Sequence, residues 1–180
     1  MINIVLLEPE QGGNVGNIGR TCLATGARLH LIEPLGFQLT DRQIRRAGMD
    51  YWYQVDVSRY MNFKDFLEKN PKAKLYMAST KSRQTYADVT YEDGCYVMFG
   101  KESAGIPEEI LKEYADSCIR IPMLPDIRSL NLANSVAIIT YEAMRQQGFE
   151  QYQQERLYHA LPAIPPRRGR VLLGLADPPR

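Results

Sequence analysis

Short apolar runs alternate with segments of helical spacing along most of the chain. The apolar runs predict strands and lie at residues 2–7, 28–32, 75–78, 96–99 and 119–121. The helical segments lie at residues 14–25, 63–69 and 132–147, with further short helices expected after Asp41 and Pro107. This alternation predicts an α/β fold with a mostly parallel sheet and helices on both faces.

The character of the chain changes near Gln151. Five of the 11 prolines fall within the last nineteen residues. A chain of 180 residues is long enough for one domain with a sizeable core and a tail. We therefore expect one domain over residues 1–150 and an irregular C-terminal extension over residues 151–180.

Composition places the chain among ordinary globular proteins, with 44% hydrophobic and 24% charged residues. It contains no apolar run of about 18 residues, and its first residues lack the basic region of a signal peptide, so we expect a cytoplasmic protein without a membrane span. Cys22, Cys95 and Cys118 are scattered singly, which favours buried thiols over disulfides or a zinc site. His30 lies within a predicted strand and is expected to be structural.

The formal net charge is +1, so charge alone does not indicate a nucleic-acid-binding protein. Any RNA-binding hypothesis must rest on local motifs. Three segments that follow predicted strands are the candidates, because open parallel sheets place ligands at the carboxyl ends of their strands.

The first candidate segment is residues 9–20, a glycine-rich turn that enters a helix. Its glycines allow close approach of a ligand, its helix-start amides attract anions, and Arg20 is placed to hold a phosphate. A dinucleotide site is an alternative, and Glu33 ends the second strand as a ribose-binding acid would. The spacing G-G-x-x-G-x-x-G differs from the dinucleotide pattern, however, and a plain tight turn remains open.

The second and third segments each mix small and polar residues. Residues 99–107 carry two glycines and Glu102 between a strand and a helix, where a flexible loop is the simpler interpretation. Residues 121–135 form an irregular loop that runs into a helix, and its Ser and Asn residues are also typical helix caps.

Together the three segments resemble motifs of the SPOUT methyltransferase superfamily, above all its small branch that methylates the wobble-nucleotide ribose of tRNA. The pattern N-x-G-N-I-x-R matches residues 14–20, and F-G-x-E-x-x-G-I-P matches residues 99–107. The pattern I-P-M-x(4)-R-S-L-N-L-x-N-S-V-A matches residues 121–137. The stretches LHLIEPLGF and RRAGMDYW also look like this branch, so the resemblance runs from Met1 to about Phe149.

This resemblance implies a fold and a reaction that spacing alone does not show. The C-terminal part of the domain is expected to thread into a deep trefoil knot, a rare exception to the usual topology rules. The implied reaction is S-adenosylmethionine-dependent 2′-O-methylation of the wobble cytidine or uridine, with the anticodon stem-loop of tRNA(Leu) as expected substrate. Homodimers are expected, with tRNA spanning both subunits. Gln11-Gly12 and Ala104 depart from the residues common in relatives.

The resemblance also implies which residues hold the cofactor. Its adenine and ribose are expected to meet backbone, with one loop closing over the remainder. No metal is expected, because methyl transfer from a sulfonium requires no Lewis acid. The expected cofactor-binding residues are Ala78, Gly100, Glu102, Gly105, Ile121, Met123, Ser129 and Leu130.

A ribose 2′-hydroxyl is a weak nucleophile, so the enzyme must orient it and help remove its proton. Arginine stays protonated in proteins and cannot act as a free base. We expect Arg20 to bind the phosphate beside the target ribose, and Glu102 to orient Arg20 or the ribose. The expected catalytic residues are Arg20, Glu102, Ser129 and Asn131.

Arginines at helical spacing provide a candidate RNA surface that the net charge hides. A solvated charged face is the simpler interpretation of such a run. The expected RNA-binding residues are Asn14, Asn17, Arg20, Arg42, Arg45, Arg46, Lys81 and Arg128.

The last predicted helix is apolar on more than one side. One stripe suits the core, and a second stripe that includes Tyr141 predicts a dimer interface. Two other functions remain as alternatives: an RNA-binding relative without catalytic activity, and a nicotinamide oxidoreductase. The retained Arg20, Glu102, Ser129 and Asn131 disfavour the first, and the glycine spacing disfavours the second.

Overall fold

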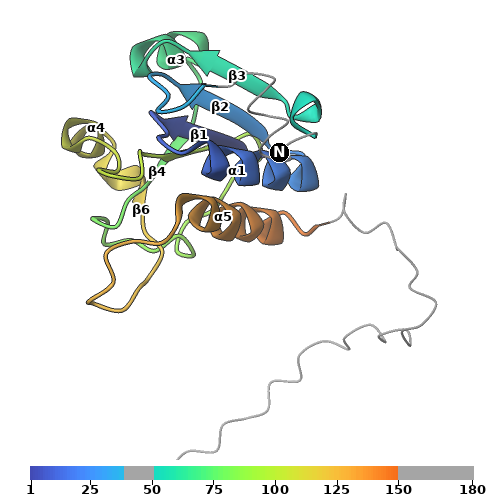
Figure 1. The fold of residues 1–180 in the computed structure, drawn as a ribbon. Helices are drawn as coiled ribbons and strands as arrows, with labels where there is room; N and C mark the ends of the chain where they lie inside the picture. Colours follow the sequence, from blue (N-terminus) through green and yellow to red (C-terminus); the bar gives the residue numbers. More distant parts are fainter. Residues whose placement is uncertain (39–50, 150–180) are drawn as a thin grey trace, which may run out of the picture. The chain divides into compact units, whose positions relative to one another are not determined.

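The computed structural model describes residues 1–38 and 51–149, and the structural statements below concern these residues. Figure 1 shows strands and helices alternating along the chain. The elements are β1 (Asn3–Leu7), α1 (Gly12–Thr25), β2 (Arg28–Ile32), η1 (Trp52–Gln54), β3 (Val57–Tyr60), α3 (Phe63–Lys69), β4 (Leu75–Ala78), β5 (Tyr96–Phe99), α4 (Glu108–Glu113), η2 (Ala115–Ser117), β6 (Cys118–Ile119) and α5 (Leu132–Gln146).

The strands form one parallel sheet in the order β3-β2-β1-β5-β4-β6. Ile4 of β1 pairs with Leu29 of β2 on one side and with Val97 of β5 on the other. The chain builds outward from β1 to β3 and then continues on the other half of the sheet, so the strand order reverses beside β1. Ligands of open parallel sheets bind at such a reversal, outside the carboxyl ends of the strands.

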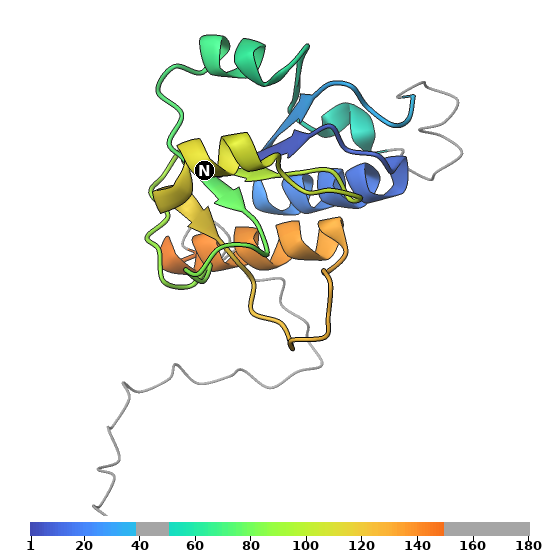
Figure 2. The same cartoon turned by 90° about the vertical axis from the view of Figure 1, so that its left-hand side faces the viewer.

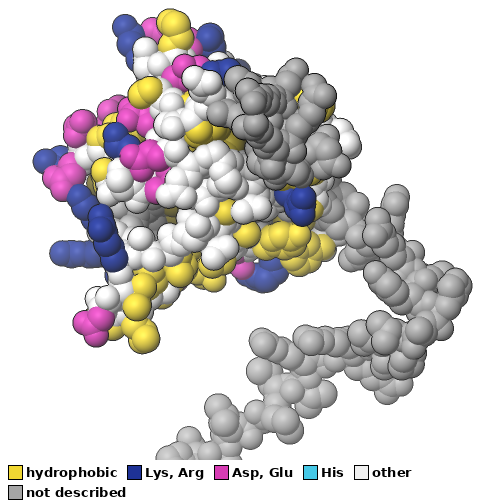
Figure 3. Space-filling view, viewed as in Figure 1, with side chains coloured by type: hydrophobic (Ala, Val, Ile, Leu, Met, Phe, Trp, Pro, Cys, Tyr) yellow, Lys and Arg dark blue, Asp and Glu magenta, His cyan; other side chains and the backbone are white. Residues whose placement is uncertain are grey.

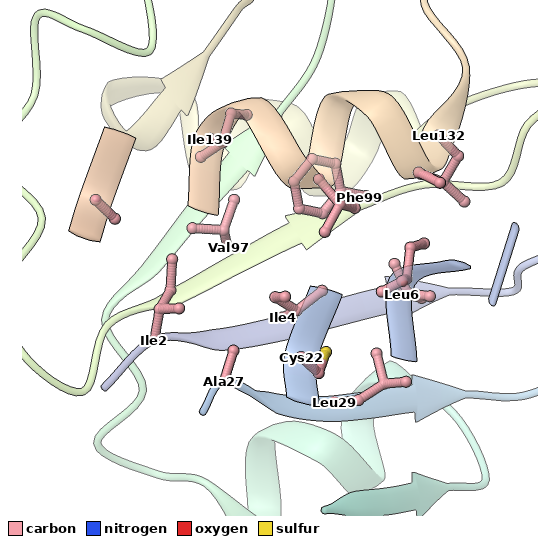
Figure 4. Packing of buried hydrophobic residues seen from close by; sticks show 14 of the residues in the cluster. Ile2, Ile4, Leu6, Cys22, Ala27, Leu29, Val97, Phe99, Leu132 and Ile139 are labelled. Atoms are coloured by element: carbon pink, nitrogen blue, oxygen red, sulfur yellow. The ribbon is translucent and has the colours of Figure 1, made fainter. Parts of the chain in front are cut away.

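Side chains of β1 alternate between the two faces of the sheet. Ile4 and Leu6 join a core cluster with α1 and α5, whereas Val5 and Leu7 join a second cluster with α3 and α4. Figure 2 shows helices on both faces, and Figure 4 shows the first cluster packed between β1, β5 and α5. Because each fully buried aliphatic side chain contributes roughly 2 kcal/mol, this burial fixes β1 at the centre of the fold.

The predicted α/β fold with a parallel sheet and helices on both faces is confirmed, with three corrections to its elements. The edge strand β3 was not predicted, because only Tyr60 of its four residues is buried and the segment does not read as an apolar run. The last strand is also shorter and earlier than predicted, at Cys118–Ile119. Helix α1 begins at Gly12, two residues before the predicted start.

His30 is structural, as predicted. Its Nδ1 accepts a hydrogen bond of 2.8 Å from the Tyr60 hydroxyl, and its Nε2 lies 3.2 Å from Oδ1 of Asn3. Asn3 uses its amide nitrogen to donate to the carbonyl of Gly94, so its Oδ1 accepts from His30. Burial lowers the pKa of His30 to about 4, which keeps the ring neutral.

Other predictions have mixed outcomes. The three cysteines are buried and free, as predicted. None of the helices in residues 1–38 and 51–149 has the length and apolar character needed to cross a membrane. The C-terminal extension, the helix expected after Asp41 and the predicted RNA-binding residues Arg42, Arg45 and Arg46 all lie outside the described residues.

Candidate functional site

A cleft of about 410 Å³ lies at the carboxyl edge of the sheet. Its walls come from the segments that follow four parallel strands, together with the first half of α5. The size lies within the range usual for small-molecule sites. Its lining comprises residues 78–81 after β4, residues 99–106 after β5, eight residues between 119 and 132, Gln11 and Asn14 near the start of α1, and Ser135 and Ile139 of α5.

All the predicted cofactor-binding residues line this one cleft. They come from three segments that lie far apart in the sequence, and the fold brings them together at the sheet edge. Ala78 ends β4, Gly100 follows β5, and Ser129 lies just before α5. The arrangement therefore surrounds one cleft with residues from three separate parts of the chain.

Gly100 allows the segment after β5 to fold back on itself. A Cβ atom at this position would lie 2.0 Å from the carbonyl carbon of Gly105, a distance that no side chain tolerates. Gly105 itself has a φ of 73°, which favours glycine, and its amide donates to the carbonyl of Lys101 at 2.8 Å. The glycines therefore shape this wall of the cleft.

The segments after β1 and β5 hold each other through reciprocal contacts. Glu10 accepts hydrogen bonds from the amide and hydroxyl of Ser103 at 2.8 and 2.7 Å, and these bonds lower the pKa of its carboxyl group. Lys101 forms an ion pair with Glu8 at 2.8 Å, which raises the pKa of its ammonium group. These contacts fix the entrance of α1 against the wall of the cleft.

Glu102 belongs to the same set of contacts. Its carboxylate accepts from the amide of Glu10 at 2.8 Å and from Nδ2 of Asn14, also at 2.8 Å. A negative charge at the start of a helix also interacts favourably with the helix dipole. Within residues 1–38 and 51–149 no hydrogen bond joins Glu102 to Arg20 of the same chain, and a role of Glu102 in orienting Arg20 or the ribose stays a prediction.

Asn14 connects this set to the third segment. Its Oδ1 accepts from Nδ2 of Asn131 at 3.0 Å, while its Nδ2 donates to Glu102. Asn131 in turn caps α5, because its Oδ1 accepts from the amide of Ala133 at 2.9 Å. One chain of side-chain hydrogen bonds thus joins all three predicted segments.

These contacts change the interpretation of two predicted residues. Asn14 is only 7% exposed and both of its amide atoms are bonded within the protein, which does not suit the predicted RNA contact. Asn131 lies at the cleft, but its side chain caps α5. Its amide therefore holds the start of this helix in place, not the reacting atoms. Ser129 lies at the cleft as expected.

Arg20 and Asn17 do not line the cleft of their own chain. Arg20 lies six residues beyond Asn14, about 9 Å further along the helix axis. Its guanidinium carbon lies 4.7 Å from the centre of the Tyr51 ring, and its side chain is exposed. The structure therefore brings Glu102, Ser129 and Asn131 together but leaves Arg20 outside.

Two of the remaining predicted RNA-binding residues lie at the cleft. Lys81 forms an ion pair with Glu108, and Arg128 donates to the carbonyl of Ser103 at 3.3 Å. Figure 3 shows lysine and arginine side chains gathered at one edge of the molecule, over the loops beside β4 and β6. A positive rim at this edge suits a polyanion, and of Lys81 and Arg128 only Lys81 is paired with an acid among the described residues.

Sequence reasoning missed the contacts of Glu8 and Glu10 with Lys101 and Ser103. The sequence does contain a hint of these contacts, because the two acids follow one strand and Lys101 and Ser103 follow another. The contacts can be inferred only when β1 and β5 are known to be neighbours.

Glu33, the acid required by the dinucleotide alternative, pairs with Arg59 at 2.7 Å. In the described part of the chain, no three His, Cys, Asp or Glu side chains group where a metal ion could bind.

Comparison with known proteins assigns the chain to a family. The SpoU rRNA Methylase family matches residues 1–141. The tRNA (cytidine(34)-2'-O)-methyltransferase of Escherichia coli (strain K12) is 48% identical over 150 residues, which cover 83% of this chain and 96% of that protein.

Solved structures agree with this assignment. One structure, described as giving insights into the 2-OH methylation of C/U34 on tRNA, has a TM-score of 0.76 and 41% identity, and covers 82% of this chain and 96% of its own. An AdoMet-bound rRNA methyltransferase from Sinorhizobium meliloti has a TM-score of 0.70 and 28% identity, and covers 80% of this chain and 56% of its own. The matched family model and the identity over most of both chains show that this chain belongs to the SpoU rRNA methylase family.

Proposed function

We propose that this chain is an S-adenosylmethionine-dependent methyltransferase that methylates the ribose 2′-hydroxyl of cytidine or uridine at tRNA position 34. The observation that carries the proposal is the cleft in which all three predicted segments meet. The similarity to the E. coli tRNA (cytidine(34)-2'-O)-methyltransferase supports the substrate and the position. We further infer that the enzyme works in the cytoplasm and that tRNA(Leu) is its substrate, the latter from the sequence resemblance alone.

The cleft suits the proposed cofactor. Ile121, Met123 and Leu130 offer apolar surface to the adenine ring and the methionine chain of the cofactor, and Ser129 offers a hydroxyl group. Gly100, whose backbone packs closely on Gly105, lies in one wall of the cleft. When bound, S-adenosylmethionine supplies a methyl group on a positively charged sulfur, which is electrophilic without a metal.

The reaction then depends on positioning the ribose hydroxyl. Arg20 holds the neighbouring phosphate, and the arginine–phosphate pair orients and polarises the hydroxyl as it loses its proton. Ser129 lies in the cleft and is available to the ribose or the cofactor. Glu102 and Asn131 hold the segments that line the cleft in place through their hydrogen bonds to Asn14.

We also propose that the enzyme is a homodimer in which Arg20 of one protomer serves the cleft of its partner. The position of Arg20 outside its own cleft supports this arrangement. Exposed apolar side chains on the neighbouring helices α1 and α5 support a contact surface, with Leu23 at 36%, Ile138 at 37% and Tyr141 at 48% exposure. Figure 3 shows hydrophobic side chains along the edge formed by α5 and the preceding loop.

We infer that the C-terminal part of the domain is threaded as a trefoil knot. The resemblance suggests this topology, and the long segment between β6 and α5 supports it, because that segment ends on Asn131 bonded to Asn14 of α1. The rim residues Lys81 and Arg128, together with Arg42, Arg45 and Arg46, are proposed to contact the anticodon stem-loop.

Transfer of tritiated methyl groups to unmodified tRNA tests the function, followed by nucleoside mass spectrometry to identify the modified position. We expect 2′-O-methylcytidine or 2′-O-methyluridine at position 34. Calorimetry with S-adenosylmethionine and NAD separates the alternatives. Binding of tRNA and cofactor without transfer would favour an inactive RNA-binding relative, and binding of NAD alone would favour an oxidoreductase.

A further inference from the structure

The side chain of Tyr51 contacts α1 twice, through the guanidinium group of Arg20 and through the backbone. The guanidinium carbon of Arg20 lies 4.7 Å from the centre of the Tyr51 ring. The hydroxyl of Tyr51 donates a hydrogen bond of 2.9 Å to the carbonyl of Gly16, one turn earlier in the same helix. The ring is therefore anchored at its far end to the helix that carries Arg20.

A second contact fixes the segment that carries Tyr51. The ring of Trp52 packs on α1 at Gly19, where a Cβ atom would lie 2.8 Å from the indole. Trp52 is only 9% exposed, so this contact belongs to the core. Gly16, Gly19 and Arg20 share one face of α1 because they are three and four residues apart. This face is shaped to seat Tyr51 and Trp52 together.

The contact with Tyr51 leaves the hydrogen-bond donors of Arg20 available. The face of an aromatic ring attracts a guanidinium group, and this attraction uses none of its five N–H donors. Within residues 1–38 and 51–149, Arg20 forms no hydrogen bond or ion pair, and the ring of Tyr51 is its one cation–π partner. Arg20 is thus held without being neutralised, a state suited to a bidentate phosphate contact.

We propose that Tyr51 is the positioning residue for Arg20, holding its guanidinium group in place for the phosphate beside the target ribose. The inference rests on the proposed function, because it assigns Tyr51 a purpose only if Arg20 acts on RNA. An unsupported arginine samples many rotamers, and ordering it during binding costs free energy. Tyr51 removes part of that cost before the RNA arrives.

The test compares Tyr51→Leu with Tyr51→Trp and Tyr51→Phe in the full-length enzyme. We expect Tyr51→Leu to lower kcat for tRNA methylation about tenfold or more, with unchanged affinity for S-adenosylmethionine. Tyr51→Trp keeps an aromatic face and is expected to restore most of the activity. Tyr51→Phe keeps the ring without its anchor at Gly16 and is expected to lie between the two.

A double mutant separates positioning from general stability. If Tyr51 acts through Arg20, then adding Tyr51→Leu to Arg20→Ala lowers kcat no further. Tyr114→Leu is the matched control, because it removes a half-buried tyrosine on the opposite face of the sheet. Its melting temperature shows what loss of such a ring does to the fold alone.

Two results would overturn the inference. The first is a Tyr51→Leu enzyme with normal kcat. The second is a Tyr51→Leu substitution that lowers kcat by the same factor in the Arg20→Ala enzyme as in the wild-type enzyme. If Tyr51→Leu does not fold, the comparison of Tyr51→Phe with Tyr51→Trp decides, and failure of Trp to exceed Phe in kcat counts against it. Failure of the proposed function looks different, because the wild-type enzyme would then transfer no methyl group or Arg20→Ala would remain fully active.

Discussion

Asn131 donates a hydrogen bond of 3.0 Å to the side-chain oxygen of Asn14, across 117 residues of sequence. Asn14 also donates a hydrogen bond to Glu102, so the amide of this one buried residue links the three segments that line the cleft. An amide suits this position because it donates on one side and accepts on the other. No carboxylate or aliphatic side chain of similar size has both abilities.

We predict that Asn14→Asp weakens cofactor binding and the fold together. The carboxylate would face Glu102 without a donor between them, and loss of this buried hydrogen bond costs about 1–3 kcal/mol. Calorimetry with S-adenosylmethionine and thermal unfolding measure the two effects. Asn17→Asp, at an exposed position one turn along α1, is the control and should leave both values near those of wild type.

Gly100→Ala is expected to close the cleft. The new methyl group would overlap the backbone at Gly105 and force the segment after β5 to move. We expect loss of cofactor affinity by calorimetry and a lower melting temperature. Gly13→Ala is the matched control, since a Cβ there meets nothing within 4 Å, and it should stabilise the enzyme by roughly 0.5–1 kcal/mol. Unchanged affinity in Gly100→Ala would contradict the role of this wall.

Arg20→Ala is predicted to abolish most methyl transfer while the fold and the cofactor affinity persist, because Arg20 lies outside the cleft. Arg20→Lys should rescue poorly, because an ammonium group cannot reproduce the planar fork of donors. Tritiated-methyl incorporation into tRNA gives the activity, and circular dichroism checks the fold. Near-normal turnover in the Ala variant would show that the assigned role is wrong.

Tyr141→Glu is predicted to give a folded, inactive monomer. The side chain is 48% exposed in the single chain, so the protomer itself should tolerate the charge. At an interface the carboxylate would be buried without a partner, at a cost of several kcal/mol. Light scattering measures the mass. A folded monomeric variant with full activity, or a wild-type enzyme that is monomeric at micromolar concentration, would refute the shared site.

His30 predicts a loss of stability in acid. Its pKa is about 4 in the folded protein against an ordinary value of 6.5, so the unfolded chain binds the proton more readily. This contribution to stability is fully present above pH 6.5 and is lost as the pH falls towards 4, by about 3 kcal/mol at most. Urea unfolding between these pH values measures the slope, and His30→Gln should flatten it.

The sequence pattern predicts the central strands well, because strands buried on both faces read as continuous apolar runs. The edge strand β3 escapes this signal, since Tyr60 alone is buried. The candidate segments are likewise recognisable, but their mutual contacts are not. Glu102 and Asn131 each fit an ordinary turn or cap, and only the order of strands in the sheet shows that Asn14 lies between them.

Helix α5 completes the cleft and also fills the core through Val136 and Ile139. During synthesis it leaves the ribosome after every strand of the sheet. A nascent chain that ends before Asn131 therefore lacks the cap, the bond to Asn14 and one side of the ligand site. Cofactor binding is therefore expected only after α5 has docked, which would make uptake of the methyl donor a marker that this helix is in place.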